Sequence, residues 1–97
     1  MYQILKKKTL NANTKLMVID APHVARKAEP GQFIILRVSE DGERIPLTIA
    51  DFDRETGAVT IIFQEVGATT MALGEMNEGD CLQDFVGPLG KASEFDG

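Results

Sequence analysis

The sequence predicts an all-β fold, a six-stranded antiparallel Greek-key barrel with one short helix between strands 5 and 6. Over most of the chain, apolar residues recur with a period of two rather than 3.6, which is typical of strands. Glycine, proline, asparagine and aspartate cluster between these segments, as they do in short turns. Strands do not alternate with long helices, which argues against parallel βαβ units. A chain of 97 residues is long enough for one domain with one modest core.

The predicted strands follow one another with short connections. The second strand is apolar on both faces, which suits a barrel wall that is also covered on the outside. In the fifth strand, Val59, Ile61 and Phe63 share one face. The predicted turns are Asn11-Ala12-Asn13, the hairpin at Asp41-Gly42, and Asp53–Gly57. The six strands span Tyr2–Leu10, Thr14–Asp20, Gln32–Val38, Ile45–Ala50, Ala58–Gln64 and Cys81–Val86.

The remaining segments predict one helix and a boundary. Thr69–Met76 is rich in helix formers, with Thr69 or Thr70 as its N-cap and Gly74 limiting it to one or two turns. Ala25–Ala28 is too short to predict a helix. Gly87-Pro88-Leu89-Gly90 is expected to end the last strand, so residues 1–90 form the domain and residues 91–97 begin a linker.

Composition excludes several function classes. A net charge of −5 argues against nucleic acid, whose binders need a basic surface. Lys6-Lys7-Lys8 is the only basic cluster, and a solvated edge strand explains it better than a docking surface. Apolar runs are strand-sized, so no membrane span is predicted. With one cysteine and no secretion-signal pattern at the N-terminus, the expected location is cytoplasmic.

The usual catalytic and metal-binding patterns are absent. His23 is the only histidine and has no triad or metal partner nearby, so we interpret it as a surface residue. We interpret Cys81 as a small packed apolar residue. The acidic residues at 40–43 and 51–53 are expected to be solvated turn carboxylates rather than a cation site. No catalytic residue and no metal site are therefore predicted.

Arg44-Ile45-Pro46-Leu47-Thr48-Ile49 is an unusual start for a strand. Pro46 removes one ladder hydrogen bond, which indicates an edge strand, a bulge or a bound planar ligand. Thr48 points the same way as Pro46 and offers a hydroxyl, while Arg44 suits a phosphate. Two interpretations of this segment therefore remain open. It is either an edge strand that happens to contain a proline, or a segment that binds a planar ligand.

Gly67-Ala68-Thr69-Thr70 comes directly before the predicted helix. A glycine permits close backbone approach, and the positive end of a helix attracts phosphate. Helix N-caps use the same residues for purely structural reasons, so this segment alone is weak evidence. Together with Arg44–Ile49, it suggests a dinucleotide with an aromatic ring at one segment and a pyrophosphate at the other.

These two segments, with Pro30-Gly31-Gln32-Phe33 before them and Gly87-Pro88-Leu89-Gly90 after them, resemble the ferredoxin-reductase superfamily of flavoproteins. Within it, the sequence most resembles the electron-transfer subunits of dihydroorotate dehydrogenase and of sulfide dehydrogenase/ferredoxin–NADP⁺ oxidoreductase (alpha subunit). The latter is favoured because Ile45 stands where the former commonly has a second arginine.

The resemblance implies that the barrel binds FAD. Pro46, Leu47 and Thr48 would line the isoalloxazine and ribityl groups. The pyrophosphate would be bound by Arg44, Gly67, Thr69 and Thr70. The adenosine side of FAD would be contacted, mostly through backbone groups, by Phe63, Gln64 and Glu65. Gln64 departs from the basic residue that many members carry there, so a charged contact at this position is in doubt.

The resemblance also implies a larger enzyme. An NAD(P)H-binding domain and a [2Fe-2S] cluster are expected in a C-terminal part that these residues do not include, together with a catalytic or iron–sulfur partner subunit. The full-length protein would then be a flavin-dependent NAD(P)H oxidoreductase, while the activity of these residues alone stays open. The alternative is a non-redox β-barrel that binds a protein or a small ligand.

Overall fold

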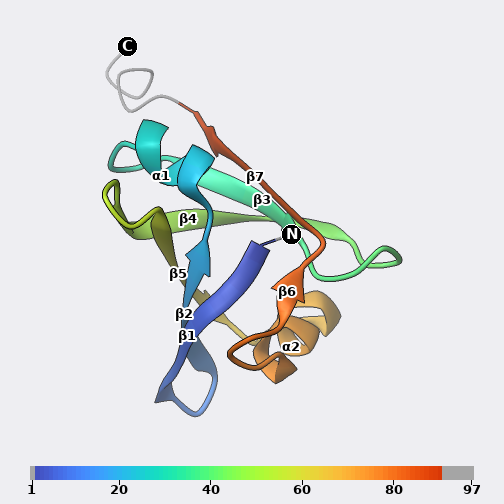
Figure 1. Ribbon diagram of the computed structural model, residues 1–97. Helices are drawn as coiled ribbons and strands as arrows, with labels where there is room; N and C mark the ends of the chain where they lie inside the picture. The colour runs from blue at the N-terminus through green and yellow to red at the C-terminus, as the bar shows by residue number, and fades with distance from the viewer. Residues whose placement is uncertain (1, 91–97) are drawn as a thin grey trace.

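The computed structural model describes residues 2–90 as seven strands and two helices (Figure 1). The predicted linker, residues 91–97, lies outside the described residues. The elements, in chain order, are β1 (Tyr2–Asn11), β2 (Thr14–Asp20), α1 (Pro22–Lys27), β3 (Phe33–Arg37), β4 (Arg44–Asp53), β5 (Ala58–Gln64), α2 (Ala68–Glu75), β6 (Cys81–Leu82) and β7 (Asp84–Leu89).

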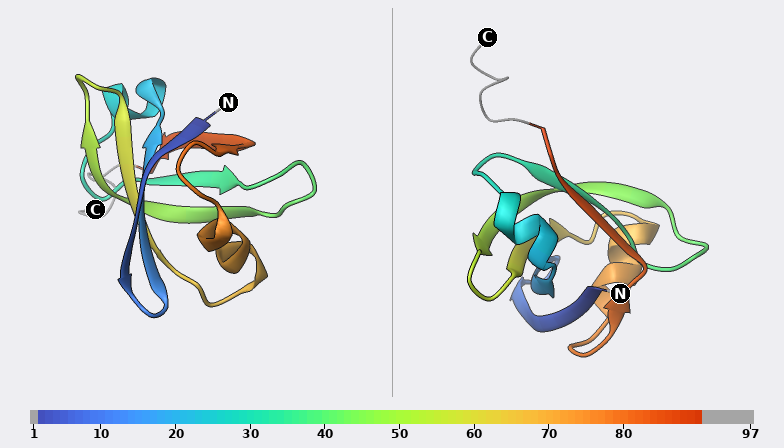
Figure 2. Two further views of the ribbon diagram at one scale, coloured as in Figure 1. Left: turned by 60° about the horizontal axis from the view of Figure 1, so that its bottom comes forward. Right: turned by 45° about the horizontal axis from the view of Figure 1, so that its top comes forward.

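The strands form one antiparallel sheet in the order β6-β1-β2-β5-β4-β3-β7. The strands β3, β4 and β5 form a meander, and β5 returns to pair with β2 along its whole length, from Thr14↔Gln64 to Asp20↔Ala58. This return is the Greek-key connection that the sequence predicted. The sheet curls into a nearly closed barrel, with α1 and α2 at opposite ends (Figures 1 and 2).

The predicted sixth strand is two strands, so the count of six was wrong. Cys81 and Leu82 pair with β1, whereas Asp84–Leu89 pair with β3. Between them, the Gln83 N–H donates to the Arg37 carbonyl at 3.0 Å. The chain turns at Gln83 because one segment serves both free edges of the curled sheet. The Gly87–Gly90 segment does not end the strand at Val86 as expected, since β7 continues to Leu89.

The helices also differ from prediction. An extra helix, α1, lies between β2 and β3 and covers one end of the barrel. The sequence predicted no helix there, because Ala25–Ala28 is too short to indicate one. Pro22 stands in the first turn of α1, and Val24 and Ala25 are buried. The helix α2 begins one residue early, with Gly67 rather than a threonine as its N-cap.

The core lies inside the barrel and is formed by the strand faces that the alternation of apolar residues predicted. Val59, Ile61 and Phe63 all point inward, and Ile4 is buried while Leu5 is 45% exposed. Cys81 is exposed, so its interpretation as a packed residue was wrong. In residues 2–90, no helix is long and apolar enough to cross a membrane. The core side chains are Ile4, Met17, Ile19, Ala21, Val24, Ala25, Ala28, Ile34, Leu36, Ile49, Val59, Ile61, Phe63, Leu73, Leu82 and Phe85.

Candidate functional site

The barrel wall opens where β4 leaves β5. The C-terminal part of β4 pairs with β5 as far as Ile49↔Ile61, with a register shift between Ile49 and Asp51. Toward its N-terminus β4 pairs with β3 instead, from Thr48↔Phe33 to Arg44↔Arg37. Within residues 2–90, positions 62–64 of β5 therefore have no partner on β4. A bulge of this kind commonly redirects a strand next to a site.

A groove of about 470 Å³ lies beside this opening. One wall is the turn between β3 and β4, and the other is the segment from the end of β5 into α2. The lining therefore joins residues that are far apart in sequence. It consists of Val38, Ser39, Asp41, Gly42, Glu43 and Ile45 on one side and Val66, Gly67, Ala68, Thr69, Thr70 and Ala72 on the other.

The N-terminus of α2 presents hydrogen-bond donors to this groove. The first helical bond runs from the Met71 N–H to the Gly67 carbonyl at 2.9 Å. The three N–H groups of residues 68–70 precede that bond and have no carbonyl one turn earlier to pair with. The positive end of the helix dipole acts at the same place. Such an arrangement suits an anion, phosphate in particular.

The two threonines have different surroundings. The Thr70 hydroxyl accepts hydrogen bonds from the N–H groups of Val66 and Gly67, both at 3.0 Å, and donates to the Gly67 carbonyl at 3.1 Å. It is thus committed to shaping the turn before the helix. The Thr69 hydroxyl makes no hydrogen bond within residues 2–90 and lines the groove. Of the two predicted hydroxyl donors, Thr69 is the one available to a ligand.

A second surface is the outward face of β3, β4 and β7. Three cross-strand rows cross it, in the order β4, β3 and β7. The first is Thr48, Phe33 and Leu89; the second is Pro46, Ile35 and Val86; the third is Arg44, Arg37 and Asp84. Two largely apolar rows are thus bordered by one charged row. Pro46 and Thr48 are exposed there and share a face, as the sequence predicted.

Arg44 lies in the charged row with its guanidinium weakly engaged. Arg37 holds the Asp84 carboxylate at 2.8 Å, while Arg44 is 3.6 Å from the same oxygen. The Arg44 side chain is 63% exposed. Since surface ion pairs of this kind contribute little, the Arg44 guanidinium is available for a bidentate contact with a phosphate.

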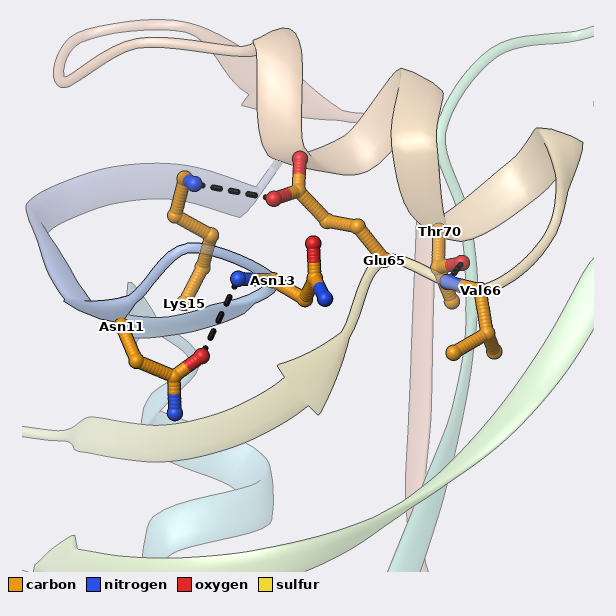
Figure 3. A network of polar contacts seen from close by, with 6 residues as sticks. All are labelled: Asn11, Asn13, Lys15, Glu65, Val66 and Thr70. Atoms are coloured by element: carbon orange, nitrogen blue, oxygen red, sulfur yellow. Dashed lines mark hydrogen bonds and ion pairs between the residues drawn. The ribbon is translucent and has the colours of Figure 1, made fainter.

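Three of the predicted site residues do not present side chains to either surface. Leu47 is half-buried against the core, opposite to Pro46 and Thr48 on β4. Phe63 is buried, so only its backbone could contact a ligand. The Glu65 carboxylate turns away toward Lys15, at 2.8 Å from its Nζ (Figure 3). Gln64, by contrast, is exposed at the end of β5.

The predicted residues therefore fall into two neighbouring places. Gly67, Thr69 and Thr70 come together in the groove, and Arg44, Pro46 and Thr48 come together on the outward face. Sequence reasoning missed the groove's other wall, residues 38–43, because Asp41-Gly42 was interpreted only as a turn. Among residues 2–90, no group of three His, Cys, Asp or Glu side chains is placed to hold a metal ion.

Comparison with known proteins identifies the family of this chain. Residues 1–93 match the family described as the oxidoreductase FAD-binding domain. A dihydroorotate dehydrogenase B (NAD⁺) electron transfer subunit homolog of Thermotoga maritima is 43% identical over 94 residues, or 97% of this chain and 33% of that protein. An uncharacterized protein in the adh 3′ region of Clostridium beijerinckii is 60% identical over 95 residues, or 98% of this chain and 32% of that protein.

A solved structure agrees with these relatives. It is the NADH-dependent reduced ferredoxin-NADP oxidoreductase, described in connection with flavin-based electron bifurcation. It is 42% identical, with a TM-score of 0.92 over 94% of this chain and 33% of that one.

The chain belongs to the oxidoreductase FAD-binding domain family, which confirms the resemblance stated from the sequence. FAD is therefore its cofactor class. The chain spans about a third of the length of the curated relatives it matches. These comparisons support the flavoprotein interpretation and not the non-redox module.

Proposed function

We propose that this domain holds FAD between the outward face of β3, β4 and β7 and the N-terminus of α2. The observation that carries the proposal is the placement of Arg44, Pro46 and Thr48 on one face, next to the groove that Thr69 lines. An apolar platform suits a flat ring system, and helix N–H groups with an exposed, weakly engaged guanidinium suit a pyrophosphate.

Each side chain then has a distinct task. Pro46 is exposed on the outward face, in a row with Ile35 and then Val86, and supports the isoalloxazine ring. The Thr48 hydroxyl, on the same face, hydrogen-bonds a polar atom at the ring edge. Arg44 and the N–H groups of residues 68–70 bind the pyrophosphate, and Thr69 adds a hydroxyl.

The remaining predicted residues contribute mainly through their backbone. Phe63 and Leu47 keep their side chains in or against the core, so we assign them only backbone contacts. Gln64 is exposed on the β5 edge that lacks a β4 partner, which suits contact with the adenosine side. A neutral Gln64 offers hydrogen bonds there without a charge.

For the full-length protein, we propose an electron-transfer subunit of an oxidoreductase. FAD, when bound, supplies hydride and single-electron transfer; the barrel residues bind and orient it. The names of the Thermotoga maritima relative and of the solved oxidoreductase support this role. NAD(P)H as electron donor, an iron–sulfur cluster and a catalytic or ferredoxin partner belong to the same proposal.

Titration of the ¹⁵N-labelled chain with FAD tests the proposal, because chemical-shift changes register weak binding as well as tight binding. We expect shifts on residues 44–48 and 67–70. Arg44→Ala should weaken FAD binding about tenfold, as expected for a charge-assisted hydrogen bond. Arg26→Ala, at the exposed end of α1, is the matched control and should leave the affinity unchanged. Equal affinities for the two variants, or no shifts in these segments, would refute the assignment.

A further inference from the structure

We propose that Lys15, Glu65 and Gly74 form a contact that fixes the N-terminus of α2 for pyrophosphate binding. Glu65 and Lys15 are then positioning residues, because their side chains bond to each other and do not touch the ligand. This inference rests on the proposed function, because it concerns the same phosphate site.

Glu65 is held at both its backbone and its side chain by the β1–β2 hairpin. Its N–H donates to the Asn13 carbonyl at 2.7 Å. Its Oε1 accepts a hydrogen bond from Lys15 Nζ at 2.8 Å, and the two side chains are only 18% and 15% exposed. The hairpin turn is itself shaped by the Asn13 N–H, which donates to Asn11 Oδ1 at 3.0 Å (Figure 3).

The other oxygen of the Glu65 carboxylate lies against α2 at Gly74. A Cβ added to Gly74 would overlap Glu65 Oε2 and would lie 2.7 Å from Cδ. The three atoms nearest to that position all belong to Glu65. The carboxylate therefore occupies the space that any other side chain at this position would need. This explains a glycine inside a helix, where it is otherwise unfavourable.

The helix α2 depends on such tertiary contacts. It has eight residues, and isolated helices of that length are not stable in water. Only Leu73 and Gly74 of this helix are buried. Leu73 anchors it in the core, and the Glu65 carboxylate is the contact at Gly74. Glu65 also directly precedes the turn that Thr70 caps, so one residue holds both the entry to the helix and its later turn.

The ion pair also suits the charge of the site. An unpaired carboxylate close to a pyrophosphate would repel it. With Lys15 on Oε1, the acidic group that shapes the site is neutralised by a partner from β2. The positive end of the α2 dipole therefore remains available to the ligand.

The test compares FAD with riboflavin, which lacks the pyrophosphate and the adenosine. Glu65→Gln and Lys15→Met should each weaken FAD binding about fivefold, while riboflavin binding changes less than about twofold. Glu55→Gln and Lys8→Met are the matched controls, since both residues are exposed, and both should leave the two affinities unchanged. Equal losses for FAD and riboflavin would overturn the positioning role, and so would unchanged FAD binding.

Amide hydrogen exchange gives a readout that is independent of flavin. In Glu65→Gln, the Met71 N–H, which forms the first bond of α2, should exchange about fivefold faster than in the wild type, while core amides of β2 and β5 keep their rates. Unchanged exchange at Met71 would refute the contact itself. If the wild type binds neither ligand, the proposed function fails, and the exchange rates still decide whether Glu65 holds the helix.

Discussion

Replacing Gly74 by alanine in two backgrounds tests the contact between Glu65, directly after β5, and α2 through protein stability. In the wild type, the new Cβ would overlap Glu65 Oε2. Because that oxygen ends a flexible side chain, the carboxylate would move and its bond to Lys15 would be lost. In the Glu65→Ala background, the nearest atoms are gone and the same substitution meets no carboxylate.

The magnitude follows from two opposing terms. Alanine in place of a helical glycine stabilises by about 1 kcal/mol, and this gain is the same in both backgrounds. In the wild type, loss of a largely buried ion pair offsets it by about 1 to 2 kcal/mol. We therefore expect Gly74→Ala to stabilise the Glu65→Ala protein by about 1 kcal/mol and to be neutral or mildly destabilising in the wild type.

Urea unfolding of the four proteins measures this difference as a coupling free energy. A chain of this size is expected to unfold in a two-state transition, so the four free energies are comparable. Helix propensity cancels in the cycle, which leaves the carboxylate contact. The reasoning is wrong if Gly74→Ala has the same effect, within about 0.3 kcal/mol, in both backgrounds.

Substitutions at Gly57, Thr70 and Phe85, the first two with a matched comparison variant, test other parts of the fold by thermal or urea unfolding. Gly57→Ala should lower the free energy of unfolding by about 2 kcal/mol, because Gly57 has φ of 80° and its added Cβ would lie 2.9 Å from Pro22. Gly79→Ala is the comparison: Gly79 has φ of 94° but open space around it, so the loss should be only about 1 kcal/mol. Thr70→Val should lower the free energy of unfolding by about 1 kcal/mol through loss of the cap before α2. Thr70→Ser keeps the hydroxyl and should therefore keep the wild-type stability. Phe85→Ala should cost about 3 to 5 kcal/mol because Phe85 is 2% exposed; a cost as small as that of a surface substitution would contradict its place in the core.

Much of the barrel could be predicted because its strands are locally encoded. Alternation in β5 assigned Val59, Ile61 and Phe63 to one face, and burial confirms it. The turn residues separated the strands at nearly the right positions. The last strand was different, since only its pairing with β1 and then with β3 shows that it bends at Gln83.

The candidate site was predicted in part for the same reason. Pro46 and Thr48 were expected on one face from their spacing alone, and the structure places them there. Thr70 was expected at the phosphate, but its hydroxyl is bonded within the turn, since a threonine at the third helical position can cap backward. Whether the residue before the helix or one within it supplies the cap depends on backbone angles that the sequence does not specify.

Glu65 marks the limit of local inference. Its carboxylate bonds to Lys15, fifty positions away, and fills the space at Gly74. No sequence pattern connects these three positions. Periodicity and turn chemistry act over a few residues, so the amino-acid order alone was enough for the strand faces and the barrel class. The pairing of distant side chains depends on how the strands β2 and β5 lie beside α2, and it was therefore visible only in the folded chain.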